Sequence, residues 1–218
     1  RDWSVTGVQT CALPICVLAD YQASHLEGAI LMGAPVSAIV QDTEGVTVTS
    51  TGGTFRGRRV VIAVPPQLYP DLGLTPELPA ERQAALATFQ LGRVYKTLAE
   101  FETPWWREGG LSGAIVNPGG MFHGISDATP AGASTHLLVA FTSGPSADAL
   151  GAEAPDEDAR IAAFTRFLSK TYGRDVPDAI GGRSYDWNTD GFSLGGYSCR
   201  RGIGGWSATP DLFAPYQH

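Results

Sequence analysis

The stretch Gly92-Arg-Val-Tyr-Lys-Thr-Leu-Ala-Glu-Phe-Glu-Thr-Pro-Trp-Trp106 decides how the rest of the chain is interpreted. Its β-branched and aromatic residues recur and alternate with polar ones up to Pro104, which predicts a β-strand. Alternate side chains of a strand lie on the same face. One face therefore carries Val94, Lys96 and Leu98, and the other carries Tyr95, Thr97, Ala99 and Phe101.

Lys96 is the unusual residue of this strand. Apolar residues flank it on its own face, and two tryptophans follow the strand. A cation in an apolar setting is costly unless something uses it. Periodicity alone favours the Tyr95 face as the core and leaves Lys96 in solvent. The alternative is that Lys96 serves a ligand, and this strand by itself does not decide between the two.

The composition indicates a globular protein with a substantial core. The chain has 218 residues, of which 43% are hydrophobic and 17% charged, as is typical of folded chains. The net charge is −7 and no run is rich in Lys or Arg, which argues against nucleic acid or an anionic membrane as a partner. No apolar run approaches the ~20 residues of a membrane-spanning helix. We therefore expect no nucleic-acid partner and no membrane segment.

The cysteines and histidines indicate neither a disulfide framework nor a metal site. Three cysteines cannot form an even set, and their spacing relative to the four histidines does not match zinc motifs. We expect reduced thiols, no bound metal and a cytoplasmic location. The cysteines are Cys11, Cys16 and Cys199.

The first residues look unlike the start of a domain. Val5–Ile15 resembles the translation of a DNA-sequencing library adapter. A secretory signal would need a basic start and an unbroken apolar core, which Asp2 and Pro14 interrupt. We set residues 1–16 apart as an artefactual segment and expect an irregular arm there. The chain starts without Met and stops in a loop-like run, so we expect a fragment of a longer protein.

Short strands and one helix are expected before the lysine strand. Val17–Ser24 resembles the tail of a further helix. Val60–Val64 is a continuous apolar run, which predicts a strand covered on both faces. Pro79 and Gly92 fit the two ends of a helix over Pro79–Gln90. The other expected strands are Ala29–Met32, Pro35–Gln41 and Val46–Thr49, joined by turns at Asp42–Gly45 and Gly52–Gly53.

After the lysine strand, the clearest element is a helix over Asp156–Tyr172. Its apolar residues recur at helical spacing and Gly173 follows its end. Strands are expected at Leu111–Val116, Phe122–Ser126 and Thr135–Phe141. From Ser184 onward the chain is aromatic and glycine-rich, and we expect irregular structure.

Most familiar catalytic patterns are absent from the sequence. There is no Gly-x-Ser-x-Gly elbow, and no Gly-x-Gly-x-x-Gly follows a strand after the adapter-like segment. What remains is Lys96, Trp187 and the turn Gly195-Gly196-Tyr197. Glycines let the backbone approach a flat ligand closely, and aromatic rings supply walls for it. This combination indicates a planar cofactor.

An ordered set of short motifs resembles the flavin-dependent amine oxidases, the monoamine oxidase family. The motifs are Ala34-Pro-Val36, Val60-Val-Ile-Ala-Val-Pro-Pro66, Leu74-Thr-Pro-Glu-Leu-Pro79, Leu91-Gly-Arg-Val-Tyr-Lys96, Pro104-Trp-Trp106, Asp127-Ala-Thr-Pro130, Trp187 and Gly195-Gly196-Tyr197. The resemblance implies a mixed α/β (α+β) fold. A partial FAD-binding domain is expected at 17–84 and a substrate-binding domain, built on a mixed β-sheet with helices, at 85–186. Residues 187–218 would return to the FAD-binding domain, which is truncated.

The resemblance also implies roles for individual residues. Pro35 and Val36 fall where the family's backbone contacts the adenine end of FAD. Lys96 falls where a lysine holds a water against the flavin, and Trp187 where a tryptophan lines the flavin. Gly195 and Gly196 fall where the chain passes under the isoalloxazine. Some members attach FAD through a cysteine directly after this pair, but here Tyr197 follows, so we expect non-covalent FAD, with Tyr197 nearest the substrate.

The implied reaction is the oxidation of an amine to an imine and then an aldehyde, with molecular oxygen as acceptor and release of hydrogen peroxide. Lys96 and Tyr197 are the expected catalytic residues. Two alternatives stay open. The chain could be a non-catalytic fragment that does not hold FAD, because the family's phosphate-binding fingerprint would precede Val17. The substrate could also be a polyamine or an L-amino acid, with Arg93, Arg107 or Arg183 available for a carboxylate.

Overall fold

The computed structural model describes residues 13–26, 28, 30–207 and 209–213. The chain divides into two compact units. The first unit contains Arg93–Thr189 together with α1 (Leu13–Ser24), and the second contains Leu26–Gly92 and the residues from Asp190 onward. Each unit has its own sheet and its own core, so each is described separately.

The first unit is built on a five-stranded antiparallel sheet with the strand order β10-β6-β9-β8-β7. The lysine strand is the long strand β6, and it pairs with β9 on one side and β10 on the other. The strands are β6 (Val94–Phe101), β7 (Ile115–Val116), β8 (Gly124–Asp127), β9 (His136–Ser143) and β10 (Gly181–Asp186). Lys96 is therefore near the middle of the best-paired strand of the sheet.

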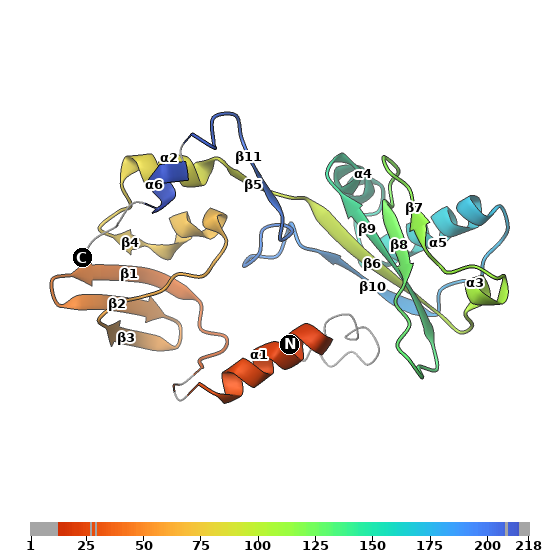
Figure 1. Cartoon of the computed structure of the whole chain (residues 1–218), viewed down its shortest axis with the longest axis horizontal. Helices are drawn as coiled ribbons and strands as arrows, with labels where there is room; N and C mark the ends of the chain where they lie inside the picture. Colours follow the sequence, from red (N-terminus) through yellow and green to blue (C-terminus); the bar gives the residue numbers. More distant parts are fainter. Residues whose placement is uncertain (1–12, 27, 29, 208, 214–218) are drawn as a thin grey trace. The chain divides into compact units, whose positions relative to one another are not determined.

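Two helices cover one face of this sheet (Figure 1). Helix α4 (Pro145–Glu153) contacts β9, and α5 (Glu157–Tyr172) contacts β6 and β10. Helix α5 begins where the Asp156 side chain accepts a hydrogen bond from Ala159 N, and it ends at Gly173, whose φ is 62°. The end at Gly173 was expected from the sequence, because Gly tolerates the left-handed conformation. Asp156 was expected inside the helix and instead caps it, as Asp often does.

The core of the first unit lies between the sheet and these helices. Tyr95, Ala99 and Phe101 of β6 are buried there, so the prediction that their face forms the core is confirmed. The short helix α3 (Trp105–Glu108) adds two buried tryptophans. The largest fully buried side chains of this core are Trp106, Phe101, Phe122, Phe164, Leu138, Leu150 and Leu168.

The second unit contains a four-stranded sheet with the order β3-β2-β1-β4. The expected strands Pro35–Gln41 and Val46–Thr49 are confirmed as β1 (Val36–Asp42) and β2 (Gly45–Ser50), an antiparallel pair joined by a tight turn. Asp42 Oδ1 accepts hydrogen bonds from the backbone of Glu44 and Gly45 and so stabilises this turn. The other strands are β3 (Gly53–Gly57) and β4 (Leu74–Thr75), which runs parallel to β1.

The second unit also contains a two-stranded antiparallel sheet of β5 (Phe89–Leu91) and β11 (Cys199–Arg201). Its helices are the 3-10 helix η2 (Pro66–Leu72), α2 (Ala80–Ala87) and α6 (Thr209–Phe213). The helix predicted over Pro79–Gln90 is thus shorter than expected, because Phe89 and Gln90 pair with β11 instead.

Several sequence-based expectations are wrong. Val60–Val64 forms no strand, and Val61 is 90% exposed, because none of the strands in the described residues pairs with this segment. Residues 30–32 are also not a strand. The strand expected over Leu111–Val116 is only Ile115–Val116. Gly181–Asp186, partly expected to be irregular, is the strand β10 because β6 offers it a full ladder of partners.

The N-terminal expectation is only partly within the described residues. Residues 1–12 lie outside them, whereas Leu13–Cys16 form the first turn of α1 and are not irregular. Among the helices of the described residues, none is both long and apolar enough to cross a membrane.

Candidate functional site

The site candidate in the first unit is the sheet face that points away from α4 and α5. The register pairs Lys96 with Tyr185 of β10 and with Phe141 of β9. Because directly paired residues share a face, these three side chains form a row across the sheet. Gly124 pairs with Phe141 and extends the row into β8. We call the surface made by Tyr185, Lys96, Phe141, Gly124 and Trp187 the open face.

Lys96 is half-buried within this row. Its Nζ lies 5.7 Å from the centroid of the Phe141 ring, within range of a cation–π contact. Phe141 itself is 41% exposed. An added side chain at Gly124 would meet nothing within 4 Å, so the surface beside Phe141 is open. The lysine is thus neither buried in the core nor free of aromatic neighbours.

Trp187 directly follows β10 and joins the same face. Its ring lies 4.6 Å from the Tyr185 ring, centroid to centroid, at an interplanar angle of 62°. Trp187 is 39% exposed. The structure therefore brings Lys96 and Trp187 onto one face, through Tyr185, as two of the sequence-predicted cofactor residues.

A buried polar network supports the strands from the helix side. The guanidinium of Arg160 donates to Ser184 Oγ and to the backbone oxygens of Ala154, Pro155 and Ser184. The hydroxyls of Ser184 and Thr97 lie 2.9 Å apart. These groups tie α5 to β10 and β6 directly beneath the residues of the open face.

The remaining predicted site residues belong to the second unit. Pro35 and Val36 are exposed at the start of β1. The Pro35 oxygen accepts from Thr51 N, and Val36 pairs with Ser50. The Tyr197 side chain is 100% exposed, and it makes none of the hydrogen bonds found among the described residues.

The backbone at Gly195 and Gly196 lies beside the backbone at Gly92. Gly196 N donates to Gly92 O at 2.7 Å, and Gly92 N donates to Ser198 O at 2.8 Å. A Cβ added at Gly195 would lie 2.7 Å from the Leu91 Cβ, and its φ is +150°. Within this unit, residue 195 must therefore be a glycine because its backbone lies close to Leu91.

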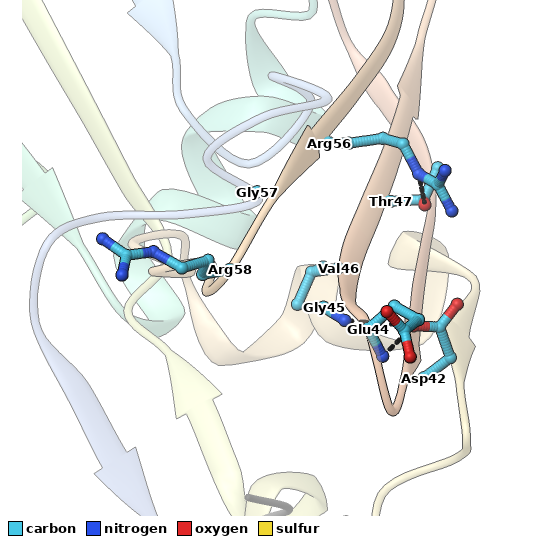
Figure 2. A pocket seen from close by; sticks show the side chains of 8 residues that line it. All are labelled: Asp42, Glu44, Gly45, Val46, Thr47, Arg56, Gly57 and Arg58. Atoms are coloured by element: carbon cyan, nitrogen blue, oxygen red, sulfur yellow. Dashed lines mark hydrogen bonds between the residues drawn. The ribbon is translucent and has the colours of Figure 1, made fainter.

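A hollow of about 310 Å³ lies at the β1–β2 turn of the second unit and is lined by charged residues. Figure 2 shows the Arg56 guanidinium beside Thr47, whereas Arg58 extends to the opposite side. Arg56 Nε donates to Thr47 Oγ1, and the Asp42 carboxylate is used by its own turn. The walls of this hollow carry charges of both signs, and Arg56 and Asp42 already have partners, so its lining favours no single kind of ligand.

Sequence reasoning missed Tyr185 and Phe141 as members of the open face. Their position depends on the register across three strands, which links residues far apart in the chain. The available signal was the alternation within Thr135–Phe141, which places Phe141 and Val139 on one face.

Comparisons with known proteins identify relatives along nearly the whole chain. Residues 13–217 match the family model described as flavin containing amine oxidoreductase. A Mycobacterium tuberculosis protein, to which a flavin-containing monoamine oxidase function is ascribed, is 30% identical over 87% of this chain and 41% of its own length. An L-amino acid dehydrogenase from Synechocystis is 28% identical over 85% of this chain and 39% of its own length.

Solved structures agree with these sequence relatives. A putrescine oxidase structure with putrescine bound superposes with a TM-score of 0.78 at 29% identity, covering 87% of this chain and 42% of that one. The chain thus spans about two fifths of the length of the relatives that it matches.

Proposed function

Because the chain belongs to the family of flavin-containing amine oxidoreductases, we propose that the complete enzyme oxidises a small-molecule amine, with FAD as cofactor and molecular oxygen as acceptor. The amine loses two electrons and two protons, which oxygen finally takes up, and gives an imine, which water hydrolyses to an aldehyde and ammonia. Oxygen takes up the electrons and leaves as hydrogen peroxide. Bound FAD supplies this redox chemistry, and the protein supplies binding, orientation and electrostatics.

The observation that carries the proposal is the composition of the open face. Lys96 stands between the aromatic rings of Tyr185 and Phe141, and Trp187 packs against Tyr185. Exposed aromatic rings on a rigid sheet suit a flat, largely apolar ring system, and an ammonium group among them suits a polar atom at its edge. The residues present therefore fit the isoalloxazine part of FAD.

Each residue of the open face has a defined task under this proposal. Lys96 Nζ can donate up to three hydrogen bonds, and we assign it to holding a water against the flavin. Trp187, Tyr185 and Phe141 exclude bulk water and orient the flat ring. Apolar walls of this kind favour the uncharged form of the amine, because a charged ammonium would lose its hydration there.

The arginines of the first unit favour an amine over an amino acid as substrate. An amino-acid substrate needs a cation for its carboxylate, and the sequence offered Arg93, Arg107 and Arg183. Each of the three already pairs with a carboxylate, namely Asp148, Asp127 and Glu157 respectively. Monoamine and polyamine substrates both stay within the proposal.

We assign the cofactor to non-covalent binding. The residue after the Gly195-Gly196 pair is Tyr197, and the thiol of Cys199 comes two positions later, exposed on β11. Acid precipitation of the yellow enzyme should release the flavin into the supernatant. Flavin that stays with the precipitated protein would contradict this assignment.

The proposal is tested by peroxide release from a panel of monoamines and polyamines with the full-length enzyme. Lys96→Met should lower kcat on the order of tenfold or more, because the water that Nζ holds is lost. Lys170→Met is the matched control, since Lys170 is the other lysine of the chain and is exposed on α5. Full activity in Lys96→Met would remove the role given to this residue.

A second candidate is that the chain by itself is not catalytic. It spans about two fifths of its relatives, and its apolar segment Val60–Val64 is left without strand partners among the described residues. An absorbance spectrum of the purified chain with added FAD decides between the two. A bound flavin band after gel filtration would refute this candidate.

A further inference from the structure

Strand β10 ends in an unusual way at the residue before Trp187. The register stops at the pair Asp186 and Tyr95, so the next rung of the ladder would place Trp187 opposite Val94. Instead, the side chain of Asn188 makes hydrogen bonds to the backbone of Val94 at this position. Val94 N donates to Asn188 Oδ1 at 3.2 Å, and Asn188 Nδ2 donates to Val94 O at 3.4 Å. A carboxamide has an oxygen that accepts and an NH2 group that donates, so it can bond both backbone groups of Val94 as a peptide group does, and one N–H is left for another acceptor.

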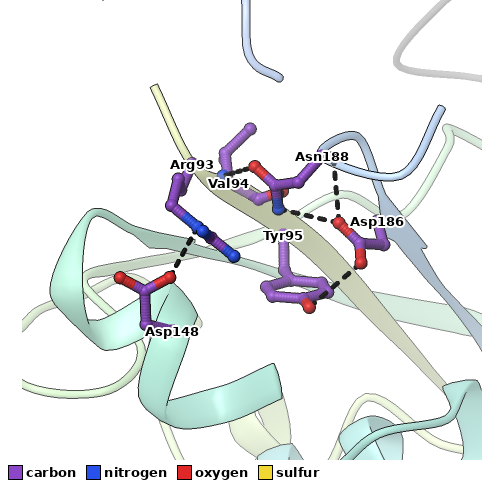
Figure 3. Close-up of polar contacts among 6 residues, drawn as sticks. All are labelled: Arg93, Val94, Tyr95, Asp148, Asp186 and Asn188. Atoms are coloured by element: carbon purple, nitrogen blue, oxygen red, sulfur yellow. Dashed lines mark hydrogen bonds and ion pairs between the residues drawn. The ribbon is translucent and has the colours of Figure 1, made fainter. Parts of the chain in front are cut away.

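Asp186 fixes the carboxamide in this orientation. Its Oδ1 accepts from Asn188 N at 2.9 Å and from Asn188 Nδ2 at 2.7 Å. Its Oδ2 accepts from the Tyr95 hydroxyl at 3.1 Å. Burial and the neighbouring Asp186 carboxylate raise the pKa of Tyr95, so the hydroxyl remains a donor at neutral pH. Figure 3 shows the three side chains converging beside β6.

Contacts with helix α4 also hold Tyr95 and Val94 in place. Gly151 of α4 lies against Tyr95, and a Cβ added there would come within 2.7 Å of the Tyr95 hydroxyl. Arg93, next to Val94, pairs with Asp148 of α4 (Figure 3). The Arg93 oxygen also accepts from Gly144 N. The backbone at Val94 is therefore anchored to α4 as well as to Asn188.

These hydrogen bonds restrain Trp187, which lies between Asp186 and Asn188 in the chain. Its ring is 39% exposed and touches Tyr185, the direct cross-strand partner of Lys96. An exposed tryptophan on a free turn would sample several rotamers. Here the residues before and after it are both held by hydrogen bonds, so its backbone is fixed while its ring stays accessible.

We propose that Asp186 and Asn188 are positioning residues, which form a side-chain clamp that orients Trp187 on the open face. The assignment of a catalytic benefit to this clamp rests on the proposed function, whereas the clamp itself does not. The hydrogen bonds of their side chains described above go to Val94, Tyr95 and each other, and not to the residues of the open face. Both act through the backbone of Trp187.

The clamp is tested first without any cofactor. The chain is labelled with 5-fluorotryptophan, and the Trp187 resonance is assigned by Trp187→Phe in the ¹⁹F NMR spectrum. Asn188→Ala and Asp186→Asn should shift or broaden this resonance, because the turn is released. Asn117→Ala is the matched control, since Asn117 also bonds a backbone oxygen with its Nδ2, at Phe122. An unchanged Trp187 resonance in a folded Asn188→Ala chain would overturn the clamp.

The second test uses the full-length enzyme with FAD. Asn188→Ala should lower kcat on the order of tenfold, because small misplacements in a site are costly, and should alter the flavin absorbance band more than Asn117→Ala does. Asn188→Asp keeps the acceptor for Val94 N but places a second carboxylate against Asp186 Oδ1 and Val94 O, so it should not restore the activity. Equal kcat values for Asn188→Ala and Asn117→Ala would overturn the positioning role. Absence of amine oxidation in the unmodified enzyme would instead refute the proposed function, and the NMR result would still decide the clamp.

Discussion

The indole nitrogen of Trp106 donates a 2.7 Å hydrogen bond to Oδ2 of Asp127, which ties a fully buried tryptophan to the end of β8. Arg107 Nε donates to the same oxygen, and Thr129 N donates to Oδ1. Asp127 is therefore the group that fastens the Trp105-Trp106 helix to the sheet. Nothing in the sequence singled it out except its place in the family-like motif.

Asp127 should make the stability of the first unit depend on pH. Burial alone would raise its pKa, but the hydrogen bonds from Arg107, Thr129 and Trp106 outweigh burial and hold the pKa well below its usual range. The unfolded state binds the proton more tightly, with a pKa of about 3.9. The stabilisation is thus fully present above about pH 5 and is lost progressively as the pH falls below that.

We expect Asp127→Asn to cost about 2 kcal/mol of unfolding free energy at pH 7 and clearly less at pH 3. Urea unfolding at the two pH values measures this. Asp148→Asn is the matched control, because its pair with Arg93 is half-exposed and such pairs are worth at most about 1 kcal/mol. A pH-independent cost for Asp127→Asn would contradict the assignment.

The sequence predicted elements well where the signals are local. Helix α5 begins and ends beside Asp156 and Gly173, and both cap signals lie within one turn of the helix ends. The two faces of β6 followed from alternation alone, and the Tyr95 face is the core as expected. In each case, the residues that determine the structure are neighbours in the chain.

The sequence failed where structure depends on partners elsewhere. The apolar run Val60–Val64 predicts burial, but burial requires strands beside it, and the described residues provide none. The polar strand β10 was not predicted, because Arg183, Ser184 and Asp186 find their partners on α5 and β6. Of the open face, the sequence singled out Lys96 and Trp187 as candidate cofactor residues, whereas Tyr185 and Phe141 needed the register.

Arg160 should be far more important for stability than Arg166, the other arginine of α5. It is only 6% exposed, it makes four hydrogen bonds, and its guanidinium lies 5.0 Å from the centre of the Tyr95 ring. Arg160→Lys keeps the charge but loses the planar fork. We expect a loss on the order of 3 kcal/mol, because buried acceptors lose their donors.

Arg166→Lys is the control for this prediction. Arg166 lies on the same helix, is largely exposed, and approaches Glu153 only to 3.7 Å. Its replacement should change the unfolding free energy by no more than about 0.5 kcal/mol. If urea unfolding gives similar values for the two variants, the buried network does not stabilise the unit in the manner described.

Gly151→Ala should destabilise the protein although alanine is the better helix former by about 1 kcal/mol. The added methyl group would meet the Tyr95 hydroxyl at 2.7 Å and break its bond to Asp186. In Tyr95→Phe the hydroxyl is gone, and the nearest ring atom is Cζ at 3.5 Å, an ordinary contact. Urea unfolding of the double-mutant cycle should therefore show a favourable coupling. Additive effects of the two substitutions would refute the contact.

Gly195→Ala tests whether this glycine is required by the fold of the second unit itself. Its φ of +150° is unfavourable for alanine, and the new Cβ would lie 2.7 Å from the Leu91 Cβ and 3.0 Å from the Gly92 oxygen. We expect a loss of about 2 kcal/mol without any ligand, with faster hydrogen exchange at Gly196, whose amide bonds Gly92 O. Gly191→Ala is the control, because its Cβ would meet nothing within 4 Å. Equal stability of the two variants without FAD would mean that Gly195 is not required by this packing, and would leave the approach of a cofactor as the reason for a glycine there.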